Sequence, residues 1–529
     1  MTTKDKGQIT QHTIHITHHA SRITAYCLLL TACCLLLFTG CQMGTPPRLE
    51  VQATRAAWTP TPTPEKLLLP VESMPVPALA TPEAALPTTP NRSIKVWINE
   101  TSAEHRAAMQ QMAAAFTDMS QVDVELMFVS PPLLPNLVNT AVLSQTLPDI
   151  IIHPIEYTAG WSERGILNAA AAETAVNQLG RDTFDPALEL VTVDGQIAAL
   201  PSDGYKQLLI YRTDWFEEAN LAIPDDFAAM YAAAEATTDR ENLRAGFVIP
   251  TESNLVTTHQ AFEQIALANG CDLIDDKGEV LLPEPPCRDA LDFYFRIVNQ
   301  FSPIGVQTDT STRNAYLAGR TGLIMVGPEM LPLLAGLDAA LPPTCPECED
   351  NRRFLVENSG ILTEIQGEGG ASAGFSNLRN LGITNAADVE TAVAFADFWF
   401  NEGYETWLSV DSERKVPLRW GTADDPTQFI DAWGHTGSPT LAELFGDTII
   451  TQLRDGVAAA PRWGLRQGQG ALLTTLYEKL TISITLQEML SGYFNPAQTI
   501  IEAYNRVTAE IPNYQYDRDL EEESQQTEN

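Results

Sequence analysis

The chain has 529 residues, and its 68 Asp and Glu against 32 Lys and Arg give it a formal net charge of −36. Nucleic acids and anionic lipid surfaces require basic patches on their partners, so this acidic balance excludes both as binding targets. The sequence has no GxxxxGK[ST] loop, and we therefore do not expect the chain to hydrolyse nucleotides itself.

The N-terminus has the features of a secretory signal. Basic residues precede Ala25 to Gly40, a stretch of sixteen mostly apolar residues. A membrane-spanning helix needs about 20 such residues, so this stretch is short for a permanent anchor. A charged start, a short apolar core and small residues before a cleavage site are typical of a signal instead. We expect residues 1–40 to be a signal peptide.

This signal ends at Thr39-Gly40-Cys41, which resembles the bacterial lipobox. In that pattern the cysteine receives lipid and becomes the mature N-terminus, so we expect Cys41 to be a lipid anchor. The lipid would hold the exported protein at the outer face of the cytoplasmic membrane, with its polar body outside. The alternative is an ordinary cleaved signal with an unrelated cysteine.

A proline-rich segment follows the cysteine. Eleven of the 35 prolines lie between Gln42 and Pro90, with TPTPTP near the centre. Such a composition cannot bury a core and favours extended polyproline II at about 3.1 Å per residue. Residues 41–92 are therefore predicted to form a Pro/Thr-rich tether. At the other end, the acidic residues 515–529 are predicted to form a disordered tail.

Four cysteines remain after the signal and Cys41, and an even number in an exported chain suggests disulfides. Cys271 and Cys287 bracket an expected hairpin and are predicted to pair. Cys345 and Cys348, in CPEC, are compatible with half a zinc site or a redox pair. Zinc would need two further ligands, and no second CxxC or histidine pair lies near. We therefore expect a local disulfide in a surface loop and no metal.

The folded body opens with alternating strands and helices. Strands are expected at 93–99, 122–129 and 148–153, with a helix from the Thr101–Glu104 capping box to Phe116 and another near 134–143. This alternation implies right-handed crossovers and a parallel sheet with helices on both faces. Ligands bind beyond the C-terminal ends of such strands. Further helices are expected at 215–219, 227–236, 258–269, 289–299, 386–401 and from Ala471 onward.

About 420 folded residues are too many for one core and suit two lobes. The segment DGQIAALPSDGYKQLLIYRTDWFEEANLAIP (194–224) resembles family 1 extracellular solute-binding proteins of the maltose-binding type, where it leads from one lobe to the other. Other pieces match that family in order: VWIN (96–99), PDIII (148–152), AYLAGRTGLIMVGPEM (315–330) and LSGYFNPAQTIIEAYNRV (490–507).

The resemblance implies a two-lobe α/β fold of the type II periplasmic-binding-protein class, in which each lobe is a sheet flanked by helices. A hinge would join the lobes, with a ligand cleft between them. Lobe 1 would comprise 93–203 and about 372–430, and lobe 2 would comprise 204–371 and about 431–514. Proteins of this family deliver a small molecule to an ABC permease, so we expect that partner and no cofactor.

The resemblance also implies where a ligand would bind. The matching positions are Glu100, Thr101, His153, Glu156, Tyr157, Asp203, Tyr205, Lys206, Glu329, Trp463 and Arg466. Carboxylates hydrogen-bond paired hydroxyls and aromatic faces stack on sugar rings, so a carbohydrate is the expected ligand. Glu329 replaces a stacking Trp of the maltose-binding type, which disfavours maltodextrin. The acids favour a neutral polyol or a cation over a phosphate ester, and His153 could instead cap a backbone group.

Gly370-Ala371-Ser372-Ala373-Gly374 matches the GxSxG nucleophile elbow, which needs a strand before it and a helix after it. Its flanks are polar and glycine-rich, so we interpret it as a return crossover between lobes. The expected protein is a monomeric, lipid-anchored binding subunit of an ABC importer and not an enzyme. The alternatives are a sensory binding lipoprotein and a surface glycosidase, which would need two carboxylates at a fixed spacing.

Overall fold

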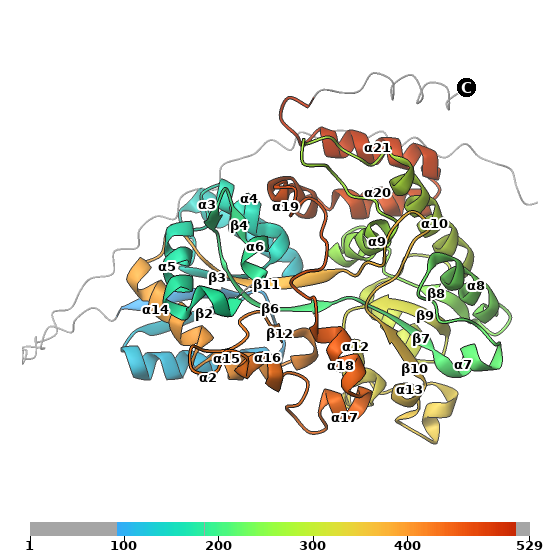
Figure 1. The fold of residues 1–529 in the computed structure, drawn as a ribbon, viewed down its shortest axis with the longest axis horizontal. Helices are drawn as coiled ribbons and strands as arrows, with labels where there is room; N and C mark the ends of the chain where they lie inside the picture. Colours follow the sequence, from blue (N-terminus) through green and yellow to red (C-terminus); the bar gives the residue numbers. More distant parts are fainter. Residues whose placement is uncertain (1–91, 185, 515–529) are drawn as a thin grey trace, which may run out of the picture. The chain divides into compact units, whose positions relative to one another are not determined.

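The structure, a computed structural model, describes residues 92–184 and 186–514 and is shown in Figure 1. The predicted signal, Cys41, nearly all of the predicted tether and the acidic tail lie outside the described residues. No helix within the described residues is long and apolar enough to cross a bilayer.

One sheet has six strands in the order β12-β6-β11-β3-β1-β2. Its strands are β1 (Ser93–Ile98), β2 (Asp123–Phe128), β3 (Ile150–Pro154), β6 (Leu200–Lys206), β11 (Ser376–Ile383) and β12 (Val416–Pro417). β1 pairs in parallel with β2 and β3, whereas β11 runs antiparallel to β3 and β6. The predicted order of three strands and two helices in a parallel arrangement is confirmed.

Helices cover both faces of this sheet. Successive side chains of a strand point to opposite sides, so a strand that is apolar throughout has apolar side chains on both faces. Ile150 and Ile152 belong to one core with α2 (Ala103–Ser120), α5 (Ala169–Leu179) and α14 (Val389–Phe400). Ile151 belongs to a second core with α3 (Leu134–Ser144) and α4 (Thr158–Glu163). The continuous apolar run of β3 therefore supplies both layers.

The first helix begins one residue later than the sequence suggests. Thr101 and Glu104 were expected to form its capping box, but Ser102 is the N-cap residue. Ser102 Oγ accepts a hydrogen bond from the backbone N of His105 at 3.1 Å and also lies 2.8 Å from His105 Nδ1. We attribute the position of the cap at Ser102 to this additional contact with the His105 side chain.

The second sheet has four strands in the order β10-β7-β9-β8. These are β7 (Leu208–Arg212), β8 (Ala245–Val248), β9 (Thr321–Val326) and β10 (Ser359–Leu362). The helices of this part are α7 (Thr213–Glu218), α8 (Phe227–Thr237), α9 (Val256–Ala268), α10 (Pro285–Phe301), α11 (Asp309–Leu317), α12 (Met330–Leu334) and α13 (Phe354–Glu357). Phe227 of α8 stacks on Phe293 of α10 at 3.9 Å between ring centroids, which joins these two helices.

Shorter elements complete the described chain. The 3-10 helices are η1 (Pro131–Leu133), η2 (Ile155–Tyr157), η3 (Arg181–Phe184), η4 (Pro346–Glu349) and η5 (Ser412–Arg414), and β4 (Thr192–Val193) pairs with β5 (Gln196–Ile197). The remaining helices are α6 (Ala187–Leu190), α15 (Tyr404–Leu408), α16 (Gln428–Ala432), α17 (Leu441–Phe445), α18 (Asp447–Arg454), α19 (Gly470–Glu478), α20 (Thr481–Leu490) and α21 (Pro496–Thr508).

The chain passes directly from one sheet to the other at Gln207, the residue between β6 and β7. It returns through the segment between β10 and β11, and the two passages meet where Gln207 N donates to Phe375 O at 2.9 Å. The GxSxG match lies in this return segment, where Ser372 Oγ donates to Glu364 at 3.1 Å. The strand β11 follows the match, so the nucleophile-elbow geometry is absent there.

α19 packs against η2 and α4, which lie beside the first sheet, while α20 packs against α9 beside the second. Figure 1 shows α19 between the two groups of elements, with α20 and α21 above α9 and α10. The segment that the sequence assigns to one lobe therefore contacts elements of both.

Both cysteine pairs form disulfides in the structure. Cys271 bonds to Cys287 with an S–S distance of 2.05 Å, and Cys345 bonds to Cys348 at 1.95 Å. Cys345 and Cys348 were expected in a surface loop, but their side chains are buried and pack in the same core as Leu355. The short helix η4 turns them inward.

Candidate functional site

A cavity of about 510 Å³ is lined by residues that follow strands of both sheets. This volume lies within the range of small-molecule sites. From the first sheet come residues after β1 and β3 and residues of β6 and β11. From the second come residues of α9 and α11 and residues at the end of β9. The polar lining comprises Asn99, Glu100, Asn136, Glu156, Tyr157, Asp203, Tyr205, Gln207, Asn254, Thr257, Gln260, Asp309, Thr310, Arg313, Glu329, Asn377, Arg379, Arg414, Tyr477 and Glu478.

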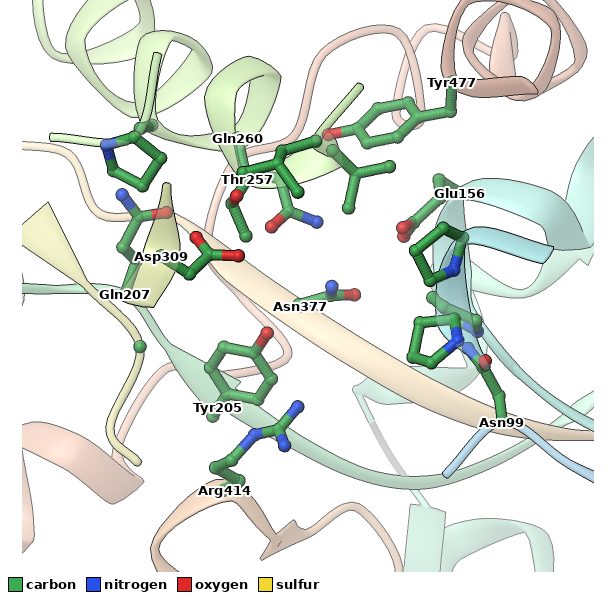
Figure 2. A pocket seen from close by; sticks show the side chains of 18 of the residues that line it. Asn99, Glu156, Tyr205, Gln207, Thr257, Gln260, Asp309, Asn377, Arg414 and Tyr477 are labelled. Carbon is green, nitrogen blue, oxygen red and sulfur yellow. The ribbon is translucent and has the colours of Figure 1, made fainter. Parts of the chain in front are cut away.

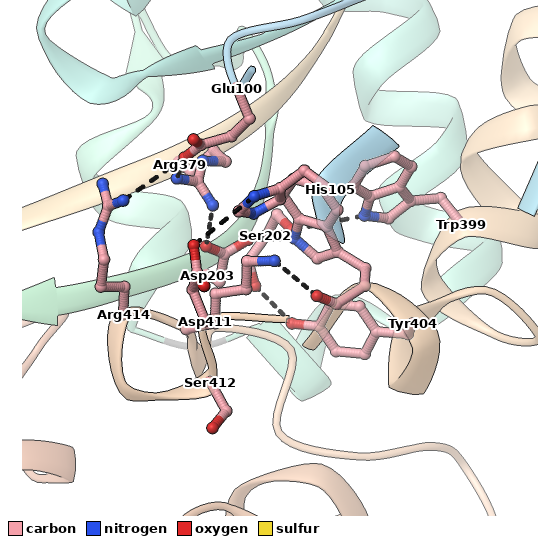
Figure 3. A network of polar contacts seen from close by, with 12 residues as sticks. Glu100, His105, Ser202, Asp203, Arg379, Trp399, Tyr404, Asp411, Ser412 and Arg414 are labelled. Carbon is pink, nitrogen blue, oxygen red and sulfur yellow. Dashed lines mark hydrogen bonds and ion pairs between the residues drawn. The ribbon is translucent and has the colours of Figure 1, made fainter. Parts of the chain in front are cut away.

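An ion-paired cluster forms the part of the lining next to β6 and β11 (Figure 3). Arg379 of β11 pairs with Asp203 of β6 at 3.0 Å and also with Glu100, which follows β1. Arg414 lies 3.8 Å from the same Glu100 carboxylate. Burial favours the neutral form of Glu100, but the two guanidinium groups outweigh it and hold the pKa of this carboxyl below its ordinary value. Glu100 is therefore ionised and already has partners.

The indole of Trp407 and the hydroxyl of Ser202 hold the Asp203 carboxylate in place by hydrogen bonds. Trp407 Nε1 donates to Asp203 at 2.6 Å, and Ser202 Oγ donates to the same oxygen at 2.7 Å. Lys415 donates to the carbonyl oxygen of Trp407 at 2.6 Å, with its Nζ 3.7 Å from the Trp407 ring centroid. Burial, with Arg379 adding to it, lowers the pKa of Lys415 to about 7. The Asp203 side of the cavity is thus rigidly held.

Glu156 stands on the other side of the cavity, on η2 after β3. Its side chain is 1% exposed, and Oε2 has no hydrogen-bond partner among the described residues. Figure 2 shows its carboxyl group pointing into the cavity, across from Asp309. Burial raises the pKa of Glu156 to about 7, although the guanidinium of Arg462 acts in the opposite direction. This carboxyl group is available to a ligand.

Tyr477 of α19 forms the neighbouring wall. Its hydroxyl donates to Glu263 at 3.1 Å and accepts from Arg462 at 3.2 Å, and Arg462 pairs with Glu263 at 2.9 Å. Thr474, one turn earlier, donates to the carbonyl oxygen of Glu156 at 2.6 Å. α19 therefore positions both Tyr477 and the loop that carries Glu156.

Six of the eleven residues predicted to contact a ligand line the cavity. They are Glu100, Glu156, Tyr157, Asp203, Tyr205 and Glu329. The other five do not line it, and for each of them the structure gives a physical reason.

Trp463 and Arg466 were expected as late aromatic and basic contacts, but neither lines this cavity. Trp463 is fully buried in the core, where its Nε1 donates to the carbonyl oxygen of Cys271 at 3.0 Å and its ring meets Phe262 edge-on. Arg466 forms an ion pair with Glu189 at 3.0 Å. The polar groups of both side chains are therefore occupied by contacts within the protein.

Thr101, His153 and Lys206 also lie outside the cavity. His153 is buried, and its Nδ1 lies 2.9 Å from the carbonyl oxygen of Pro154, as in the alternative capping interpretation. Burial lowers its pKa to about 4, so it is neutral. Lys206 lies 3.8 Å from Glu364, and Thr101 is exposed.

Several lining residues were not among the predicted ligand contacts. They include Asn99, Gln207, Thr257, Gln260, Asp309, Asn377, Arg379, Arg414 and Tyr477. Asn99 directly precedes the predicted Glu100, so its position after β1 was an available signal. Tyr477 lies in an apolar helical pattern typical of core residues, so its sequence carried no such signal. Within the described residues no group of three or more His, Cys, Asp or Glu side chains is placed to hold a metal ion.

Comparison with known proteins gives consistent results. The family model described as "Bacterial extracellular solute-binding protein" matches residues 111–435. The putative ABC transporter periplasmic-binding protein YcjN of Escherichia coli K12 is 24% identical over 410 residues, which is 73% of this chain and 90% of that protein.

Two solved structures have the same fold. An ABC transporter solute-binding protein of Thermotoga lettingae, bound with alpha-D-tagatose, is 19% identical with a TM-score of 0.62, and the match covers 79% of this chain and 99% of that one. A sugar transporter of Arthrobacter chlorophenolicus with bound laminaribiose is 16% identical with a TM-score of 0.62, over 79% and 99% of the chains.

The position of Trp463 predicts a stability effect. Trp463→Ala should lower the free energy of unfolding by about 3–5 kcal/mol, because it leaves a large cavity in a packed core. Trp420→Ala is the matched control, since Trp420 is 38% exposed and should change stability by less than about 1 kcal/mol. Urea unfolding of the two variants measures the difference. Equal stabilities would contradict the core placement of Trp463.

The buried Glu156 predicts a pH dependence. Its folded pKa, about 7, exceeds the ordinary value of 4.5, so the folded state binds more protons than the unfolded state between these values, and stability falls as pH rises through that window. Glu156→Gln has no carboxyl group at this site and should not lose stability in this way. The difference in free energy of unfolding between this variant and the wild type should therefore increase by up to about 3 kcal/mol from pH 4.5 to pH 8. Unfolding curves at several pH values test this against Glu125→Gln, an exposed control. Parallel profiles for Glu156→Gln and the wild type would contradict the prediction.

Proposed function

The chain belongs to the family of bacterial extracellular solute-binding proteins, and from this we propose that it captures a small sugar or polyol and delivers it to the permease of an ABC importer. The family consists of binding proteins that serve transport. The two solved structures described above hold a monosaccharide and a disaccharide, which supports a ligand of this class here.

The observation that carries the proposal is the composition of the cavity wall. Tyr157, Tyr205 and Tyr477 line the cavity, and tyrosine rings can stack on the apolar faces of sugar rings. Glu156, Asn99 and Asn377 each present a buried oxygen that has no hydrogen-bond partner among the described residues. Hydroxyl groups of a ligand would satisfy these oxygens, and leaving them unsatisfied costs roughly 1–3 kcal/mol each.

Ligand capture would act through lobe closure. Glu156 comes from the side of the first sheet and Gln260 and Asp309 from the side of the second. A solute that contacts both groups favours the arrangement in which they face each other, because only there does it gain both sets of contacts. Micromolar affinity, about −8 kcal/mol, suffices for this role. We propose no chemical step on the solute.

A binding experiment tests the function. A thermal-shift screen of sugars and polyols should identify a stabilising compound, and Tyr205→Ala should weaken its binding by roughly tenfold or more in calorimetry, because a stacking aromatic in a cavity is an energetic anchor. Tyr493→Ala is the matched control, since Tyr493 is 74% exposed. No stabilising sugar or polyol, an unchanged affinity in Tyr205→Ala, or turnover of the compound would overturn the proposal.

We also propose that Cys41 anchors the exported protein by lipid, which the Thr39-Gly40-Cys41 boundary supports. Cys41→Ser should move the protein from the membrane fraction to the soluble fraction, because a lipid-free tether has no apolar group to hold it. Fractionation after a carbonate wash measures this. A Cys41→Ser protein that stays in the membrane fraction would show that another segment anchors it.

A further inference from the structure

The cavity has more acidic than basic side chains, and only some of the acids form ion pairs. Its ionisable lining includes six carboxyl groups and three guanidinium groups: Glu100, Glu156, Asp203, Asp309, Glu329, Glu478, Arg313, Arg379 and Arg414. Three of the acids have ion pairs, since Arg379 and Arg414 serve Glu100, Arg379 serves Asp203, and Arg164 pairs with Glu478 at 2.6 Å.

The other three acids, Glu156, Asp309 and Glu329, have no ion pair within 4.0 Å among the described residues, and neither does Arg313. Three carboxyl groups without an ion pair thus share the cavity with one such guanidinium, and Arg462, Arg313 and Arg414 act on these acids only over longer distances. Figure 2 shows Asp309 and Glu156 directed into the cavity from opposite sides. Both acids keep raised pKa values because burial disfavours their charged forms.

Asp309 and Glu329 also act on each other. Burial raises the pKa of Asp309, and the Glu329 carboxylate raises it further, while Thr257 and Arg313 oppose the change. The Glu329 carboxylate folds back against Gly327, where an added Cβ would lie 2.1 Å from its Oε2. Asp309 and Glu329 both line the cavity, and a cation near them would relieve the repulsion between them.

The unpartnered polar atoms of the cavity wall also favour a ligand that donates hydrogen bonds. The buried lining atoms without a partner, within the part of the chain that the structure describes, are Asn99 Oδ1, Glu156 Oε2, Thr257 Oγ1, Asn377 Oδ1 and Arg414 Nε. Three are acceptors when Glu156 is ionised, one is a donor, and the Thr257 hydroxyl can act as either. A hydroxyl group can both donate and accept, whereas an ammonium group only donates. A ligand rich in donors matches this wall best.

We infer that the preferred ligand is an amine-bearing sugar or polyol, whose ammonium group lies beside Asp309 and Glu329 while its hydroxyl groups bind Glu156 and the amides. This inference rests on the proposed function and names the substrate class of the same site. Neutral sugars satisfy the hydrogen bonds but leave the acids without an ion pair, and phosphorylated sugars add a like charge. The ammonium forms the charge-assisted hydrogen bonds that these carboxylates otherwise lack.

Matched ligand pairs test the inference. The pairs are D-glucose and D-glucosamine, D-galactose and D-galactosamine, and sorbitol and 1-amino-1-deoxysorbitol, with the N-acetyl forms of the two amino sugars as neutral controls. In calorimetry with the full exported chain at pH 6, at least one amino compound should bind tenfold or more tightly than its hydroxyl partner. The N-acetyl forms should lose this advantage, because they carry no charge.

Two variants test whether Asp309 is responsible for the preference for amines. Asp309→Asn should reduce the ratio of amine to hydroxyl affinity to near one, because the amide carries no charge to favour the ammonium. Glu235→Gln, at an exposed site on α8, should leave the ratio unchanged. Hydroxyl compounds that bind as tightly as their amines, or an amine advantage that persists in Asp309→Asn, would overturn the inference and leave the proposed function intact. If no sugar or polyol binds, with or without an amine, both are overturned.

Discussion

The pairing of Arg379 with Glu100 and Asp203 is the interaction on which the site depends. It ties together the segment after β1, the middle of β6 and the middle of β11, strands that are far apart in the sequence. Removing one member of a buried ion pair leaves an uncompensated charge, which is strongly unfavourable. The same pairing consumes two of the six cavity acids. The cavity acids that have no ion pair are Glu156 on η2, Asp309 at the start of α11 and Glu329 just before α12.

α19 provides a second support, from a different direction. Thr474 holds the backbone of Glu156, Tyr477 reaches the buried pair of Arg462 and Glu263, and Glu478 accepts from Trp161 Nε1 at 3.1 Å. One helix thus fixes a loop beside the first sheet and contacts α9 beside the second. Its role is mechanical as well as chemical, because a shift of α19 would move Glu156 and Tyr477 together.

The sequence was most informative where local periodicity determines structure. β1, β2 and β3 could be predicted, and Glu100, Glu156 and Tyr157 followed because parallel strands present their C-terminal ends at one edge. Trp463 could not be placed, since a loop aromatic points inward or outward according to its neighbours, here Cys271 and Phe262. Asp309 and Arg379 reach the cavity only through the assembled sheets, so no local pattern marks them.

The direct passage at Gln207 has a kinematic consequence. In any rotation of one sheet against the other about the contact between Gln207 and Phe375, displacement grows with distance from that pivot. Tyr205 and Asn377 lie within two residues of the pivot and serve as a nearly stationary platform. Glu156 and Asp309 lie farther from the pivot, so the distance between them changes with the angle between the lobes. A solute that rests on Tyr205 and Asn377 would thus be approached by Glu156 and Asp309 as the lobes close.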